Sequence, residues 1–226
     1  MTHNLTIKGC LLALALAWIG FVTPGFCQTE TPGDHYAYEG DVLPPDHVPA
    51  INYNTAGTAD KTSTDGSLLT LTDLPQYDGI RFTAAFTPTG FSAATMTMEL
   101  RVRVTSGAMT FVVGDSSKSF QFGITPTGVT FPSRIDPTGA IVADFTQFRR
   151  LRIVIENGQL SAYVQDESNY IQGADITGGA FPAVDFYADH AGQATNCQLD
   201  YIRSTTQVLH PEQWWLPVEL NSFVVE

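Results

Sequence analysis

The chain has 226 residues, with 23 acidic and 11 basic side chains and a formal net charge of −12 at neutral pH. This charge repels nucleic acid and anionic membrane surfaces, so neither is expected as a partner. Hydrophobic residues make up 43% of the chain, enough for one large core without disulfide staples.

Residues 1–27 carry the pattern of a secretory signal peptide. Lys8 precedes an unbroken apolar run over Cys10–Val22, and Pro24 ends it. We expect cleavage after Cys27; the alternative is a lipoprotein acylated on Cys27. A membrane span needs about 20 apolar residues, and no later stretch has them, so no span is expected in the mature protein. The sequence therefore predicts a secreted protein, extracellular or on the cell surface.

The next segment, residues 28–66, is rich in Thr, Pro, Gly and Asp. It is predicted to form an extended lead-in with at most one short strand, near Ile51–Tyr53. From Ser67 onward apolar residues recur at every second position, which is typical of strands with one buried face. The clearest strand is 96–104, and no later segment has a sustained helical period. The other alternating segments are 80–86, Met109–Val113, Phe120–Ile124, Leu151–Ile155, Leu160–Val164, Val184–Ala188 and Cys197–Tyr201.

Local signals within these segments refine the prediction. Asn157-Gly158 joins two alternating stretches, and this dipeptide favours a two-residue type I′ hairpin turn. Many short strands at this spacing indicate a two-sheet sandwich or a barrel. Cys197 is the only cysteine after the signal, so no intrachain disulfide is expected, and it is predicted to be a small buried apolar residue.

Three stretches resemble concanavalin A-like and laminin G-like jelly rolls. FTQFRRLRIVIENGQLSAYVQDES resembles their paired strands, TDGSLLTLTD their first core strand and NCQLDYIRST their last. The resemblance covers about residues 51–205 and implies an all-β fold, a two-sheet antiparallel jelly-roll sandwich over residues 67–205. It also implies a domain that binds carbohydrate or another extracellular surface. The alternative is a structural or adhesive spacer without a small ligand. The oligomeric state is left open.

The resemblance implies that aromatic and polar side chains on the concave sheet, or on the loops at one edge, contact the glycan, and which sheet is concave is left open. Five residues on the outward parity of their strands are candidates: Tyr163, Tyr187, Arg101, Arg152 and Gln198. The alternative is that they only coat the second face against solvent or loops. Trp214 and Trp215 follow the last strand, so the sandwich offers no tryptophan platform. Such folds often hold a structural calcium ion, and Asp200 matches the position of its acidic ligand.

Catalysis is not expected from the motifs. The Glu-x-Asp-x-x-Glu string of concanavalin A-like glycosidases is absent, and Asp185 and Asp189 are about 13 Å apart by strand spacing, beyond the range of a glycosidase pair. Gly114-Asp115-Ser116 with His210 resembles blocks of GDSL-type esterases. The acid expected three residues before that histidine is replaced by Gln207, so a hairpin turn is expected instead. The prediction is a non-catalytic module, and a glycan-active or GDSL-like hydrolase is the less favoured alternative.

The tail, residues 206–226, contains LPVELNSF. This string resembles the junction that leads into a secretion-sorting module in secreted bacterial proteins with gliding-type secretion. Either the chain is a truncated form of a longer protein, or the segment adds a terminal strand.

Overall fold

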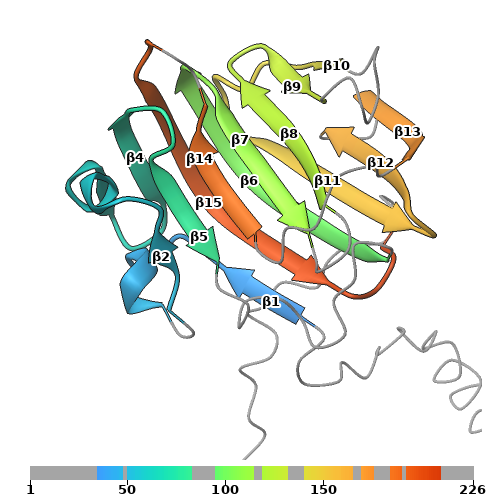
Figure 1. The fold of residues 1–226 in the computed structure, drawn as a ribbon, viewed down its shortest axis with the longest axis horizontal. Coiled ribbons are helices and arrows are strands. Elements are labelled where there is room, and N and C mark those ends of the chain that lie inside the picture. The colour runs from blue at the N-terminus through green and yellow to red at the C-terminus, as the bar shows by residue number, and fades with distance from the viewer. Residues whose placement is uncertain are drawn as a thin grey trace, which may run out of the picture. The chain divides into compact units, whose positions relative to one another are not determined.

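The described chain forms two antiparallel β-sheets and two short 3-10 turns (Figure 1). The computed structural model describes residues 35–47, 50–82, 95–114, 119–131, 140–164, 169–175, 184–189 and 192–209. The predicted signal peptide and the tail from residue 210 lie outside these ranges. Within them, no helix has the length and apolar character to cross a membrane.

The first sheet is named here the β6–β15 sheet, after its two longest strands. Its strands follow the spatial order β13-β12-β11-β6-β15-β4-β3, and β1 pairs with β15 as well. Figure 1 shows β15 in orange beside β6 in green. The strand bounds are β1 His35–Tyr38, β3 Thr62–Thr64, β4 Leu69–Leu74, β6 Met96–Ser106, β11 Arg149–Glu156, β12 Gln159–Val164, β13 Asn169–Asp175 and β15 Thr195–Thr205.

The second sheet is named the β7–β14 sheet, after its two central pairing strands. Its order is β10-β9-β8-β7-β14-β5-β2. The bounds are β2 Asn52–Tyr53, β5 Gly79–Phe82, β7 Met109–Gly114, β8 Ser119–Thr125, β9 Gly128–Thr130, β10 Ala140–Val142 and β14 Val184–Ala188, with 3-10 turns η1 Pro44–Asp46 and η2 Ala56–Lys61.

The core lies between the inner faces of these two sheets. Met98, Leu100 and Ile153 of the β6–β15 sheet are fully buried, as their alternation predicted. From the other sheet, Phe111 packs against Phe186 on β14, with 5.8 Å between ring centroids. One apolar cluster contains side chains of both sheets. The predicted fold class, an all-β jelly-roll sandwich, is confirmed.

The Asn157-Gly158 hairpin has the predicted geometry. Asn157 has φ 53° and Gly158 has φ 77°, the positive values that a type I′ turn needs. The turn joins β11 to β12 with Glu156 opposite Gln159. It thereby fixes the register of the whole β11–β12 pair.

The lead-in contains more structure than predicted. A strand near Ile51–Tyr53 is present as β2, but β1 and β3 are strands too. Both were missed because they are short, four residues in β1 and three in β3. In addition, β1 pairs with a strand far along the chain, His35 of β1 opposite Thr205 of β15. The predicted strand at 80–86 is described only as β5, since residues 83–94 lie outside the described ranges.

Candidate functional site

The outer face of the β6–β15 sheet carries a buried charge cluster. Arg152 on β11 donates from Nε to a carboxylate oxygen of Glu99 on β6 at 2.8 Å, and their side chains are only 6% and 3% exposed. Tyr201 donates its phenol proton to the other oxygen of Glu99 at 2.7 Å. Arg152 was predicted to contact a glycan. The structure places it in a buried ion pair, with Nε and Nη2 both on the Glu99 carboxylate, and the glycan contact stays a prediction.

Arg101 and Asp200 lie next to this cluster and pair with each other. The Arg101 guanidinium donates to the Asp200 carboxylate and lies 4.9 Å from the ring centre of Phe148. Within the described ranges, no group of three or more His, Cys, Asp or Glu residues forms a metal site. The calcium ion at Asp200 therefore stays a prediction, and a bound cation there would compete with Arg101.

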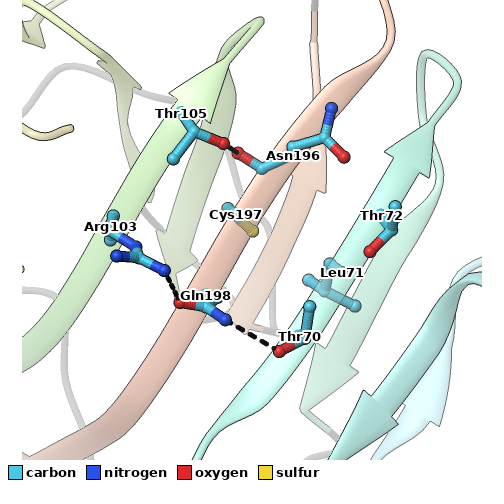
Figure 2. Close-up of a pocket in the computed structure, with 8 residues that line it drawn as sticks. All are labelled: Thr70, Leu71, Thr72, Arg103, Thr105, Asn196, Cys197 and Gln198. Carbon is cyan, nitrogen blue, oxygen red and sulfur yellow. Dashed lines mark hydrogen bonds between the residues drawn. The ribbon is translucent and has the colours of Figure 1, made fainter.

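Gln198 lines a hollow of about 220 Å³ on the same outer face. Figure 2 shows its residues on three neighbouring strands: Thr70, Leu71 and Thr72 on β4, Arg103 and Thr105 on β6, and Asn196, Cys197 and Gln198 on β15. The ladder is irregular here, because the β15 register shifts between Thr195 and Cys197. A bulge of this kind opens the strand and re-aims its side chains.

Tyr163 and Tyr187 lie on different sheets. Tyr163 is on β12, opposite Arg152 in the β6–β15 sheet, whereas Tyr187 is on β14 in the other sheet. Both face outward, as their parity predicted. Of the five predicted glycan contacts, Tyr187 is therefore separated from the other four by the thickness of the sandwich.

Tyr187 belongs to a second cluster, on the outer face of the β7–β14 sheet. Asp185, Tyr187 and Asp189 alternate with the core residues of β14. Arg81 on β5 lies opposite Asp185 and binds it with two hydrogen bonds, 2.7 and 2.6 Å long. The Asp185 side chain is 3% exposed, while half of the Arg81 side chain is open to solvent. Asp185 is thus a fixed, neutralised charge beneath the surface.

Asp189 differs from Asp185 because neutral groups hold it. Thr110 donates its hydroxyl to one carboxylate oxygen at 3.1 Å, and Gln76 donates its amide to the other at 3.2 Å. Thr110 lies opposite Tyr187, two residues back along the strand toward Asp185. The Asp189 carboxylate is therefore held by Thr110 of β7 and by Gln76 of the turn before β5. The expected spacing of about 13 Å from Asp185 was counted between backbone positions and stays a prediction for the carboxylates.

An exposed aromatic, Tyr77, completes this cluster. Its side chain is 60% exposed and its ring centre lies 6.2 Å from that of Tyr187. Tyr77 has φ 73°, a left-handed conformation that costs a non-glycine residue about 1–2 kcal/mol. Its N–H donates to the carbonyl of Ala188 at 2.7 Å and holds it there. Strain of this kind often accompanies a functional role. Sequence parity missed Tyr77, since it lies in the turn before β5.

The phenol of Tyr187 stays protonated near neutral pH. Burial raises its pKa first, and the nearby carboxylates of Asp189 and Asp185 raise it further. The outer face of β14 presents this protonated phenol beside the half-buried carboxylate of Asp189. We call Tyr77, Arg81, Asp185, Tyr187 and Asp189 the β14 cluster.

Gly79 makes room for this cluster. A Cβ at position 79 would lie 2.2 Å from the carbonyl oxygen of Phe186 and 2.5 Å from the Cα of Tyr187. Since both are backbone atoms, Gly79→Ala is expected to lower the free energy of unfolding by about 1–3 kcal/mol in urea denaturation. Gly57→Ala is the control, because its nearest neighbour is a side-chain oxygen of Asp78 at 3.3 Å. An equal loss in both variants would contradict the prediction.

Among the other nucleophile candidates, the structure describes the side chain of Cys197. Cys197 is a free, buried thiol, and burial raises its pKa, so it is inert as predicted. Of the Gly114-Asp115-Ser116 turn only Gly114 is described, at the end of β7. Ser116 and His210 lie outside the described residues.

No family model matches the chain, and no curated protein matches it. Three solved structures show what it is similar to. A β-glucanase from Bacillus licheniformis is 9% identical with a TM-score of 0.54, covering 78% of this chain and 100% of that one. A Trypanosoma rangeli sialidase, in complex with 2,3-difluorosialic acid as a covalent intermediate, is 11% identical with a TM-score of 0.50, covering 71% of this chain. Botulinum neurotoxin type C, whose cell entry depends on two ganglioside molecules, is 8% identical with a TM-score of 0.50, covering 72% and 44%.

These matches correct the prediction of a non-catalytic module and support the prediction of a concanavalin A-like fold. The expectation of a non-catalytic module is contradicted, because glycoside hydrolases share the fold, and the β-glucanase shares it over its full length. The chain spans less than a third of the sialidase, 28% of its length. At such low identity the likeness shows the fold alone. That fold is the concanavalin A-like jelly roll.

Proposed function

We propose that this protein is a glycan-active enzyme that hydrolyses glycosidic bonds on the outer face of the β7–β14 sheet. One observation carries the proposal: β14 presents Asp185, Tyr187 and Asp189 on one face, beside the exposed ring of Tyr77. Glycoside hydrolysis needs a base for water and a proton donor for the leaving oxygen. The names of the similar enzymes support a glycan as substrate.

Each member of the β14 cluster has a role in this proposal. Asp189, the more accessible carboxylate, takes a proton from the attacking water. Tyr187 keeps its proton at neutral pH and gives it to the leaving oxygen. Asp185 and Arg81 form a fixed ion pair that sets the local charge, and Tyr77 offers an apolar ring face to a sugar with its hydroxyl in water.

The proposal includes the compartment. A signal peptide over residues 1–27 would deliver the enzyme to the cell exterior, where polysaccharides are available. Two further resemblances belong to the same proposal. One is to laminin G-like domains, and the other, in residues 206–226, is to the junction that leads into a secretion-sorting module.

The test is a hydrolysis screen with matched variants. The full chain is incubated with β-glucans, xylan and sialylated glycans, and reducing ends are measured. Wild type is expected to release product from at least one of them. Tyr77→Ala is expected to raise KM about tenfold with a smaller change in kcat, because stacking contributes to binding. Tyr163→Ala, on the opposite sheet, is the control and should leave both constants unchanged. Absence of product from every glycan overturns the proposal.

A further inference from the structure

The hollow on the β6–β15 sheet has an unusual charge balance. Arg103 is the only charged residue among the eight that line it, and no Asp or Glu is among them. The other arginines described on this face with carboxylate partners are Arg101 with Asp200, Arg152 with Glu99 and Arg203 with Glu39. Arg103 instead donates from Nη2 to the neutral amide oxygen of Gln198 (Figure 2). The hollow is therefore a local positive site on an acidic protein.

Of the two Arg103 donors on the Nε side of the guanidinium, only one has a hydrogen-bond partner. Its Nε is buried and has no hydrogen-bond partner. Nε and Nη2 together form the fork that a carboxylate binds with two parallel hydrogen bonds. Gln198 supplies one oxygen and so satisfies one of the two donors. An unsatisfied buried donor is costly, which makes a two-oxygen acceptor strongly preferred at this edge.

The surroundings hold Arg103 in place for such an acceptor. Its guanidinium lies 5.1 Å from the ring centre of Phe148, a cation–π contact that limits its rotation. Gln198 is fixed from the other side, because its amide nitrogen donates to the hydroxyl oxygen of Thr70 at 3.1 Å. Asn196 spans the end of the hollow, bound to the N–H of Asp73 and to Ser106. Arg103 is thus oriented before any ligand binds, and the Gln198 oxygen occupies the position that a ligand oxygen would take.

We infer that this hollow binds the carboxylate of an acidic sugar, a uronic or sialic acid unit. The carboxylate displaces the Gln198 oxygen and accepts from both Nε and Nη2 of Arg103. The hydroxyls of Thr70, Thr72 and Thr105 line the hollow and suit the hydroxyls of a sugar ring. A volume of about 220 Å³ lies below the roughly 300–1,000 Å³ of drug-sized sites, which fits one sugar unit. The site lies on the sheet opposite the β14 cluster and is independent of hydrolysis there.

The experiment is a titration of the full chain by isothermal titration calorimetry, which measures binding in every variant, with NMR of the Arg103 Nε–H as a second readout in the proteins that keep Arg103. Glucuronic acid and sialic acid are expected to shift this resonance, whereas glucose is not. Gln198→Glu places an internal carboxylate on the same edge, so it should weaken uronate binding about tenfold or more while raising the melting temperature. Arg103→Gln should weaken binding equally, and it serves if Gln198→Glu fails to fold. Arg101→Gln is the matched control, because Arg101 already pairs with Asp200, and it should bind as wild type does.

Three outcomes would overturn the inference. Glucose binding as tightly as glucuronic acid would mean that the hollow recognises the sugar hydroxyls and that the carboxylate contributes nothing to binding. Acetate binding as tightly would mean that no sugar ring is recognised. Unchanged uronate binding in Arg103→Gln would mean that Arg103 does not bind the carboxylate. Each result is independent of the hydrolysis screen, so the two proposals fail separately.

Discussion

Asp189→Asn is expected to lower glycan hydrolysis by about 10²–10⁴-fold, the usual contribution of a positioned base. Asparagine has the same shape and keeps one oxygen that accepts from Thr110, whose hydroxyl lies 3.1 Å from the carboxylate, while the Gln76 side chain can rotate its amide to accept from the new NH₂ group. Asparagine cannot take a proton from water. Binding of the glycan and the melting temperature should therefore remain close to wild type, while the rate of reducing-end release falls.

Two variants make this result specific. Tyr187→Phe removes the proposed proton donor and keeps the ring, so it should lower kcat without abolishing binding. Asp200→Asn removes a carboxylate from the opposite sheet and should leave hydrolysis intact. If Asp189→Asn retains wild-type kcat, Asp189 is not the base, and the assignment of the β14 cluster as the catalytic site is wrong.

Arg152→Leu is expected to lower the free energy of unfolding by about 3–5 kcal/mol. The substitution leaves the Glu99 carboxylate buried without its ion-pair partner, and such a charge is strongly destabilising. Glu99 is 2% exposed, so water does not replace the guanidinium. Urea denaturation followed by far-UV circular dichroism measures the change.

A double variant separates the ion pair from simple packing. Glu99→Gln removes the charge and still accepts the hydrogen bond from Tyr201. Combined with Arg152→Leu, it should therefore recover most of the lost stability. Arg101→Leu is the control, since that ion pair is 45% and 24% exposed and exposed pairs contribute at most about 1 kcal/mol. An additive loss in the double variant would contradict a buried-charge origin.

The fold was predictable because burial follows a period of two. Met98, Leu100 and Ile153 turned inward as their alternation required, and Asn157-Gly158 placed a hairpin by local conformational preference. These are properties of neighbouring residues. The strand β1 was missed, because only its pairing with β15 defines it.

The candidate site was less predictable, because outward parity does not tell what lies beside a residue. The Arg152 side chain lies on the outer face of its sheet, but it is buried in an ion pair with Glu99, which is 53 positions away in the chain. Tyr163 and Tyr187 have the same parity and lie on opposite sheets. Asp185 and Asp189 were noticed as a same-face pair, but their different partners, Arg81 for one and Thr110 with Gln76 for the other, come from β5, β7 and a turn. Tyr77 gave no periodic signal at all.

The pairing of β1 with β15 has a consequence for how the protein is made. His35 and Thr205 are neighbours in space although 170 positions separate them in the chain. Loops this long close slowly, so the last ladder to form should be this one. While the ribosome still holds β15, the edge of β6 that pairs with it stays open to other chains, and a holding chaperone that covers this edge would be useful during that interval.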